Sequence, residues 1–284
     1  MSEGDYQRRF GGIRRLYGDE AFRHLSRLHV CVIGLGGVGS WAVEALARSG
    51  VGRLTLIDFD EICISNINRQ LHASSVTIGQ KKLEVMAQRV AAINPHCRCH
   101  VIEDFVTTRT VARYLAVEHG YDYVIDAIDS IKHKAEIIYF CKRNKIPVVT
   151  TGGAGGTTDP SMIKVGDLSR TYNDPLAAKV RARLRTEFGY TRNRKRRFGV
   201  ECVFSSQQKL YPRADGRVTH AKPGVHGVSL DCRLGYGSAS FVTATFGFVA
   251  ASRVINRSLQ KRVKGDGEYA SAVPGFRSAS DDPV

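Results

Sequence analysis

The chain has 284 residues, of which 43% are hydrophobic, so it can bury a core and is not a disordered chain. Seven cysteines are too few for a disulfide scaffold, and their odd number, with no secretory leader, predicts a cytoplasmic protein. Forty-two basic against 27 acidic residues give a net charge of +15, which indicates a polyanionic partner.

Strand and helix patterns alternate along the first half of the chain. Residues 1–28 are an N-terminal segment, expected to be loose up to residue 10 and helical over 18–28. Apolar runs typical of buried strands lie at 29–33, 53–57, 97–102, 121–128 and 147–151. Helical patterns lie at 40–50, 80–93, 107–118 and 131–144. For residues 29–151 this alternation predicts an α/β fold with a doubly wound, mostly parallel Rossmann-like sheet.

After residue 151 the pattern changes, and residues 152–260 are expected to form a C-terminal extension. It begins with a glycine-rich connection at 152–156 and contains short strand patterns at 161–165 and 200–205. Residues 234–252 hold no charge over 19 positions, which is long enough to span a bilayer. Their many small and hydroxylated residues favour a buried or dimer-facing helix over a membrane span. The polar residues 261–284 are predicted to be a disordered tail.

Basic residues cluster within the extension. Between residues 179 and 197 nine basic side chains face one acidic one, so this stretch carries about +8, half of the total charge. Such clustering multiplies phosphate contacts and favours nucleic-acid binding over a merely solvated loop, and arginine suits bidentate phosphate pairing. The candidate nucleic-acid-binding residues are Arg181, Arg183, Arg185, Arg192, Arg194, Lys195, Arg196 and Arg197.

A glycine-rich loop follows the first predicted strand. Gly34, Gly36 and Gly39 stand between that strand and a helix, which is the context of a nucleotide-binding GxGxxG motif. Glycine lets phosphate approach the backbone N–H groups at the helix N-terminus. Asp58 lies 19 residues after Gly39 and suits a carboxylate that accepts hydrogen bonds from ribose. These features alone do not separate a dinucleotide from ATP.

The residues that follow Asp58 favour ATP over a redox dinucleotide. Asn, Arg, Gln and Lys side chains gather between residues 65 and 82, and a triphosphate needs a donor for each of its oxygens. Asp126 and Asp129 end a later strand, at the edge where open α/β sheets bind ligands. A carboxylate beside phosphates is a typical Mg²⁺ ligand. Asp129 could alternatively cap the helix predicted at 131–144.

In chain order, these motifs resemble those of the ubiquitin-activating-enzyme-like adenylyltransferases. The shared motifs are GLGGVGS, DFD, SNINRQ, GQKK and DAIDS, within residues 9–151. Further motifs are similar to one branch of that family, the tRNA threonylcarbamoyladenosine dehydratases, and extend the resemblance to about residue 255. They are RFGG and RLYG near the N-terminus, then VVTTGGAGG, DPLAAK, VECVFS and VTATFGF.

The resemblance implies an ATP-dependent cyclisation on tRNA. ATP would activate the threonyl carboxylate of the modified adenosine beside the anticodon as an acyl adenylate, and the neighbouring carbamoyl group would close a ring with net loss of water. Because the substrate carries its own tethered nucleophile, such an enzyme needs phosphate-binding residues and Mg²⁺ more than a nucleophile. The wider family offers an alternative, an adenylyltransferase that activates the C-terminal Gly-Gly of a small sulfur-carrier protein.

Residue roles also follow from the resemblance. Arg69 and Lys82 would stabilise the charge of the transition state, and Asp129 would hold Mg²⁺. In the family an N-terminal arginine reaches into the partner subunit, which implies a homodimer. Because Gly12 occupies the matching position here, Arg15 or the neighbouring Arg9 is expected to replace it. The implied nucleotide-binding residues are Gly34, Gly36, Gly39, Asp58, Asp60, Asn66, Arg69, Gln70, Lys82 and Asp126.

The cysteines depart from the pattern of the sulfur-carrier enzymes, which usually hold zinc with two CxxC pairs. This chain has only Cys97 and Cys99 as a CxC, so it is predicted to bind no zinc. Cys202 lies in a motif beyond the nucleotide-binding region and is the best candidate for a functional thiol. The family's association with cysteine-desulfurase sulfur relays makes such proteins candidate partners, although ring closure itself requires no enzyme thiol.

Overall fold

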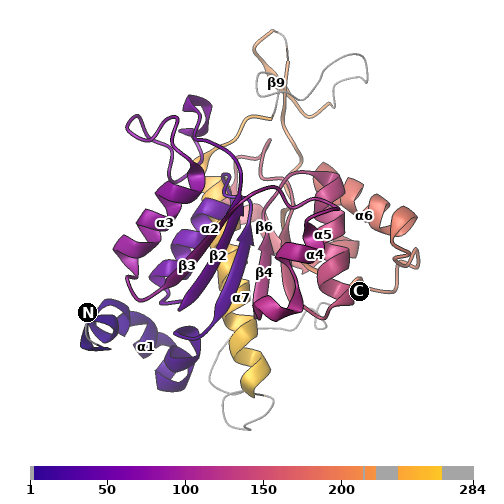
Figure 1. The fold of residues 1–284 in the computed structure, drawn as a ribbon. Helices are drawn as coiled ribbons and strands as arrows, with labels where there is room; N and C mark the ends of the chain where they lie inside the picture. Colours follow the sequence, from indigo (N-terminus) through magenta and orange to yellow (C-terminus); the bar gives the residue numbers. More distant parts are fainter. Residues whose placement is uncertain (1–2, 214, 222–235, 264–284) are drawn as a thin grey trace.

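The computed structural model describes residues 3–213, 215–221 and 236–263 (Figure 1). A seven-stranded sheet with the order β3-β2-β1-β4-β5-β7-β6 forms its centre. Six strands are parallel, and β6 runs antiparallel to β7. The strands are β1 (His29–Ile33), β2 (Arg53–Asp58), β3 (Arg98–Glu103), β4 (Tyr123–Asp126), β5 (Val148–Thr151), β6 (Ile163–Asp167) and β7 (Glu201–Ser205). The predicted α/β doubly wound sheet is therefore confirmed.

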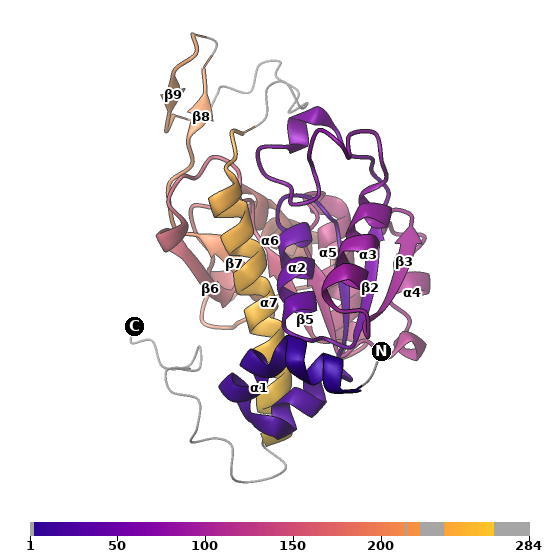
Figure 2. The same cartoon turned by 90° about the vertical axis from the view of Figure 1, so that its left-hand side faces the viewer.

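Helices cover both faces of the sheet and bury a separate core on each. On one face, α2 (Gly39–Arg48), α3 (Lys82–Ile93) and α7 (Ser240–Val263) pack side by side (Figure 2). On the other face lie α4 (Val111–Tyr114), α5 (Ile131–Arg143) and α6 (Pro175–Glu187). The two cores account for the near-continuous apolar runs in the central strands, because a parallel strand in this position is buried on both sides.

The N-terminal segment is helical from Glu3, the first residue that the structure describes, so the expectation of a loose stretch up to residue 10 is wrong. Helix α1 (Glu3–Leu25) is broken at Phe10 and at Gly18, whose φ of 84° is a conformation that favours glycine. Tyr6, Phe10 and Phe22 pack into a small cluster of their own, and the Tyr6 hydroxyl donates to the carbonyl of Gly50 at 2.5 Å. This packing orders a stretch that looks polar in sequence.

The predicted helix over 107–118 is shorter than expected. Only α4 and a short 3-10 turn η2 (Val117–His119) form there, because the region ends at Gly120 in a left-handed conformation with φ 63°. The other predicted strands and helices of the first half agree with the structure within about three residues at each end, which is the usual uncertainty of element boundaries.

Residues after 151 extend the same sheet rather than leaving it. Strand β7 pairs with β5 in parallel, and β6 pairs with β7. The two strand patterns predicted in the extension therefore enlarge the sheet, and β7 adds side chains to the cores on both of its faces. About half of the basic segment lies in helix α6. Asp174 caps the start of this helix by accepting a hydrogen bond from Ala177 N at 2.9 Å, and Pro175 occupies its first turn. A small hairpin, β8 (Tyr211–Pro212) and β9 (Val218–Thr219), follows.

The apolar stretch predicted as a helix over 234–252 forms α7, which begins at Ser240 and continues to Val263. Residues 234–235 lie outside the described residues, as does the predicted tail from 264 onward, whereas 261–263 still belong to α7. Gly247 lets α7 approach α2 closely, since a Cβ there would lie 2.5 Å from the Val38 carbonyl oxygen. Within the described part of the chain, no helix is both long and apolar enough to cross a membrane.

Candidate active site

The sheet has a switch point between β1 and β4. From β1 the chain continues to β2 and β3 on one side, and from β4 it continues to β5 on the other. The loops that leave the carboxyl ends of these two strands diverge, and ligands bind in the crevice between them in open α/β sheets. Gly34–Gly39 leaves β1, and Ala127–Asp129 leaves β4. The structure thus brings together the two loops that the sequence marked as nucleotide-binding.

The glycines of the first loop have distinct steric roles. Gly34 has φ 87°, and a Cβ there would lie 2.9 Å from Ile128 Cγ2 of the opposite loop. A Cβ on Gly39 would lie only 1.8 Å from the Gly34 carbonyl oxygen, so no other residue fits that tight turn. A Cβ added to Gly36 would meet no atom within 4 Å. Its backbone is therefore open to a ligand at the N-terminus of α2, where N–H groups and the helix dipole attract phosphate.

Asp58 ends β2 beside this loop. Its Oδ2 accepts from Leu35 N at 2.5 Å, and its Oδ1 accepts from Asp60 N at 2.8 Å. These bonds hold the carboxylate against the glycine loop while leaving it partly exposed. The position agrees with the predicted role of accepting hydrogen bonds from a ribose.

Lys82 opens α3 and buries its side chain, which is only 6% exposed. Its ammonium lies 2.7 Å from the Asp60 carboxylate, whose side chain is 57% exposed. His72 is buried nearby, and neither of its ring nitrogens has a hydrogen-bond partner. Burial, together with the charge of Lys82, lowers the pKa of His72 to about 4. The lysine charge therefore faces a neutral imidazole and a carboxylate that solvent can reach.

The connection between β2 and α3 carries the other candidate phosphate-binding residues. Asn66 lies in the short turn η1 (Ile64–Asn66), and its Oδ1 accepts from Cys63 N at 3.1 Å. The Arg69 side chain passes Gly37, where an added Cβ would lie 3.3 Å from Arg69 Cγ, and its guanidinium donates to the Ser65 carbonyl at 2.6 Å. Gln70 is buried with its Oε1 unpartnered. Arg69 and Gln70 thus offer polar groups beside the glycine loop.

Two anchors of Arg69 were not expected from the sequence. The Arg69 carbonyl accepts from Trp41 Nε1 at 3.0 Å and from Thr243 Oγ1 at 3.2 Å. Trp41 belongs to α2 and Thr243 to α7. The apolar helix α7 therefore helps to position the connection between β2 and α3, a role for which the uncharged sequence of the helix gives no signal.

The two aspartates after β4 have different environments. Asp129 is exposed and has no hydrogen bond or ion pair within the described residues, and Ser130 rather than Asp129 occupies the N-cap of α5. Asp126 is fully buried, with its Oδ2 2.9 Å from Lys134 Nζ and 2.7 Å from Thr150 Oγ1. The Asp126 carboxylate therefore forms a buried ion pair that joins β4, β5 and α5, and its expected contact with the nucleotide stays a prediction.

Asp129 fits a Mg²⁺ ion that is shared with a nucleotide. Mg²⁺ is usually bound by one or two carboxylates, with phosphate oxygens and water completing its six ligands. An exposed, unpartnered carboxylate opposite the glycine loop meets that requirement. No group of three or more His, Cys, Asp or Glu side chains that could hold a metal by itself occurs among the residues that the structure describes.

Arg15 lies far from the crevice of its own chain. Helix α1 packs below the beginnings of the strands, whereas the crevice lies at their carboxyl ends (Figures 1 and 2). Arg15 is exposed on α1. The structure therefore does not bring Arg15 to the crevice of its own chain.

The basic segment divides into two parts. Residues 192–197 are an exposed loop whose Arg192, Arg194, Lys195, Arg196 and Arg197 have no acidic partner in the described structure. Asp167 fixes the end of the loop by accepting from the N–H groups of Phe198 and Gly199 at 2.9 and 2.7 Å. The α6 arginines instead have partners within the protein, which limits their use for RNA. These are Arg181 with the hydroxyl of Thr171, Arg183 with Glu187, and Arg185 with the ring of Phe198.

Cys202 lies on β7 and is fully buried. Burial, and then the charge of Asp174, raise the pKa of its thiol above the ordinary value. A buried thiol with a raised pKa is a poor nucleophile, because the thiolate is the reactive form. The geometry therefore gives no support to a role of Cys202 in catalysis.

A doubly wound sheet with a glycine loop at its switch point is the architecture of a nucleotide-binding protein. The chain belongs to the ThiF family, whose model matches residues 6–275. It is 52% identical over 260 residues to the tRNA threonylcarbamoyladenosine dehydratase of Escherichia coli, covering 91% of this chain and 96% of that relative. The corresponding dehydratase of Haemophilus influenzae is 53% identical over 259 residues, with the same coverage.

A solved structure extends this similarity to the whole fold. The E. coli tRNA N6-threonylcarbamoyladenosine dehydratase in complex with ATP superimposes with a TM-score of 0.82 at 49% identity. The match covers 93% of this chain and 98% of that one. The family expected from the sequence motifs is therefore confirmed.

Proposed function

We propose that the protein is an ATP-dependent dehydratase that cyclises threonylcarbamoyladenosine in tRNA. The arrangement of Lys82 and Arg69 around an open glycine loop, opposite an unpartnered Asp129, carries this proposal. These groups can bind a triphosphate and meet the charge of a leaving pyrophosphate. The family membership and the 52% identity to a dehydratase favour this reaction over activation of a sulfur-carrier protein.

The reaction needs two steps at one place. In the first, a carboxylate oxygen of the threonyl group attacks the α-phosphorus of ATP, forming an acyl adenylate and releasing pyrophosphate. In the second, the carbamoyl oxygen attacks the activated carbon, AMP leaves with the carboxylate oxygen, and a proton is lost. The sum is the removal of water at the expense of ATP. Because nucleophile and electrophile are tethered in the substrate, ring closure is an intramolecular step.

The residues of the chain hold the reactants in this scheme. The N–H groups of the glycine loop bind phosphate, and Asp58 accepts from the ribose. Lys82 and Arg69 neutralise the departing pyrophosphate, while Gln70 and Asn66 supply amide groups nearby. Asp129 would hold Mg²⁺, which neutralises phosphate charge when bound. We further infer that Arg15 acts in a second copy of the chain, so the working form would be a homodimer.

The substrate also needs a surface for its phosphates. The five exposed basic residues of the 192–197 loop fit this role, whereas the α6 arginines are mainly held by their own partners. We place the reaction in the cytoplasm, where the tRNA substrate resides. If a cysteine-desulfurase relay protein is a partner, it must address a thiol other than the buried Cys202.

One experiment separates the dehydratase from the alternatives. The purified protein is incubated with ATP, Mg²⁺ and tRNA that carries threonylcarbamoyladenosine. The tRNA is then digested to nucleosides, whose masses are measured by mass spectrometry. Loss of about 18 mass units from that nucleoside, accompanied by AMP, is the expected result. If no mass is lost but a protein ending in Gly-Gly drives pyrophosphate exchange, the protein is instead a sulfur-carrier adenylyltransferase.

A further inference from the structure

The charge of the β1–β3 half of the sheet differs sharply between its two edges. At the carboxyl edge, β2 ends in Asp58 and β3 ends in Glu103. At the amino edge, β2 begins with Arg53 and β3 with Arg98, and Arg27 lies two residues before β1. In this half of the sheet, the carboxyl edge therefore carries two strand-terminal carboxylates, and the opposite edge carries an arginine at the start of β2, one at the start of β3 and one in the loop before β1.

The three arginines form a row that is exposed and has no acidic partner. Arg27, Arg53 and Arg98 are all exposed, and within the described ranges none of them forms an ion pair. Arg53 and Arg98 are register partners on adjacent parallel strands. Like charges directly opposite each other in a sheet are destabilising. An anion bound between them would relieve that repulsion.

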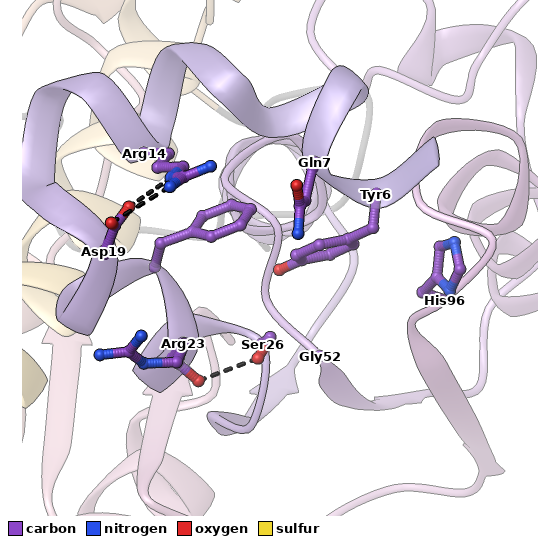
Figure 3. Close-up of a pocket in the computed structure, with 9 residues that line it drawn as sticks. Tyr6, Gln7, Arg14, Asp19, Arg23, Ser26, Gly52 and His96 are labelled. Atoms are coloured by element: carbon purple, nitrogen blue, oxygen red, sulfur yellow. Dashed lines mark hydrogen bonds and ion pairs between the residues drawn. The ribbon is translucent and has the colours of Figure 1, made fainter. Parts of the chain in front are cut away.

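A cavity of about 520 Å³ lies between α1 and the amino edge of the sheet (Figure 3). Its sheet side is lined by Ser26, Gly52 and His96, which precede Arg27, Arg53 and Arg98 by one or two positions. Its α1 side is lined by Tyr6, Gln7, Phe22, Arg23 and the ion pair of Arg14 with Asp19. Sequence neighbours of the three arginines thus line this hollow.

The exposed 192–197 loop lies at the same edge of the sheet. It leads directly into β7, which is parallel to the strands of the arginine row. Four strand spacings separate β2 from β7 in the strand order, which corresponds to about 20 Å at roughly 4.8 Å per strand. Two basic groups at that distance suit a folded RNA, whose phosphates span such lengths, better than a single nucleotide.

We propose that Arg27, Arg53 and Arg98, with the adjoining cavity, bind phosphate groups of the RNA backbone. The arginine row lies at the edge opposite the crevice, so the body of the RNA is held there while the modified nucleotide alone enters the crevice of the same or a second copy. This inference rests on the proposed function for the identity of the RNA as tRNA.

The test is tRNA binding across a salt series by a triple variant, Arg27→Gln, Arg53→Gln and Arg98→Gln. Each lost phosphate contact lowers the slope of log affinity against log salt by roughly 0.7–0.9, so the slope should fall by about 2 and low-salt affinity by about tenfold or more. ATP affinity should stay unchanged, because the crevice lies at the other edge. The corresponding triple Lys variant should keep most of the slope, since it keeps the charges.

The matched control is Arg109→Gln, Arg113→Gln and Lys132→Gln, which removes the same charge from exposed residues elsewhere. An unchanged slope in the first variant, or an equal loss in the control, would overturn the proposal. So would binding of the native protein to vesicles of anionic lipid through the arginine row with tRNA binding unaffected. Native protein that binds tRNA through the row but removes no water would refute the dehydratase function and leave this surface standing.

Discussion

Lys82 and Asp60 form an ion pair of 2.7 Å in which the lysine is buried and the aspartate is exposed. The ammonium is held in place by its surroundings, whereas the carboxylate can turn into solvent. A triphosphate entering over the glycine loop can therefore replace Asp60 as the partner of Lys82 without moving the lysine. In this proposal the Lys82 ammonium stays in place, and a phosphate replaces the Asp60 carboxylate as its counter-ion.

We expect Lys82→Ala to lower the rate of adenylate formation by about 100-fold or more, as for loss of one charged donor at a transition state. Pyrophosphate exchange under single-turnover conditions measures this step. The neighbouring Lys81 is the matched control, because it pairs with Glu103 and does not face the glycine loop. Lys81→Ala should keep nearly full activity, and similar losses in both variants would contradict the assignment.

The two aspartates after β4 should separate stability from catalysis. Breaking the buried pair by Lys134→Met leaves Asp126 without a counter-charge, which should cost about 3–5 kcal/mol of unfolding free energy. Asp129→Asn alters an exposed, unpartnered carboxylate and should change stability by less than about 0.5 kcal/mol. The Asn variant should instead need much more Mg²⁺ for adenylate formation. Urea unfolding and Mg²⁺ titration of each variant measure the two effects. A large stability loss in Asp129→Asn would show that Asp129 has a structural role, against this assignment.

His72 predicts a pH dependence of stability. Its pKa is about 4 in the folded protein, against an ordinary value of 6.5. Between these values the unfolded chain binds a proton that the folded protein excludes, so stability falls as the pH drops below 6.5. The loss from this residue should reach about 2 kcal/mol at pH 5. His72→Leu should remove that part of the slope in denaturant unfolding at pH 7.5 and 5, whereas the exposed His100→Gln should not.

Local sequence patterns predicted the parallel sheet well because its strands are short, apolar and separated by glycine or helix. Gly34 and Gly39 marked the nucleotide loop, since the tight turn between them excludes other side chains. The sequence patterns gave the wrong secondary structure where contacts between residues from different elements determine the local conformation. Residues 3–10 are polar yet form helix because Tyr6 and Phe10 pack together, and the basic run of α6 is helical because Asp174 caps it.

The roles of individual charged residues depended even more on contacts distant in sequence. Asp126 and Asp129 look alike in sequence, and only the approach of Lys134 and Thr150 separates a structural carboxylate from a free one. Arg181 is indistinguishable in sequence from the loop arginines until its contact with Thr171 is known. Motif spacing thus locates the crevice, and three-dimensional packing decides which side chains face it.

Gly247 tests the connection between α7 and the active site. An alanine Cβ would lie 2.5 Å from Val38 O and 2.8 Å from Ala42 N, so α7 must move away from α2. Gly247→Ala should lose about 1–3 kcal/mol of stability, as for overpacking, and also lower activity because Thr243 anchors Arg69. Gly12→Ala is the control, since Gly12 has open space in helix α1 and alanine should be neutral or stabilising there.

The basic loop makes a separate prediction from the arginine row. Replacing Arg194, Lys195, Arg196 and Arg197 together by Gln should weaken tRNA binding strongly. The loss should be largest at low salt, because the variant releases fewer counterions on binding and this release favours binding most when the salt concentration is low. Each lost contact should reduce the log–log salt slope by roughly 0.7–0.9. ATP affinity should not change, since the loop leads into the amino end of β7 and the crevice lies at the carboxyl ends of β1 and β4. Filter binding of tRNA beside ATP titration measures both, and a quadruple variant with native slope and affinity would show that these charges serve only solvation.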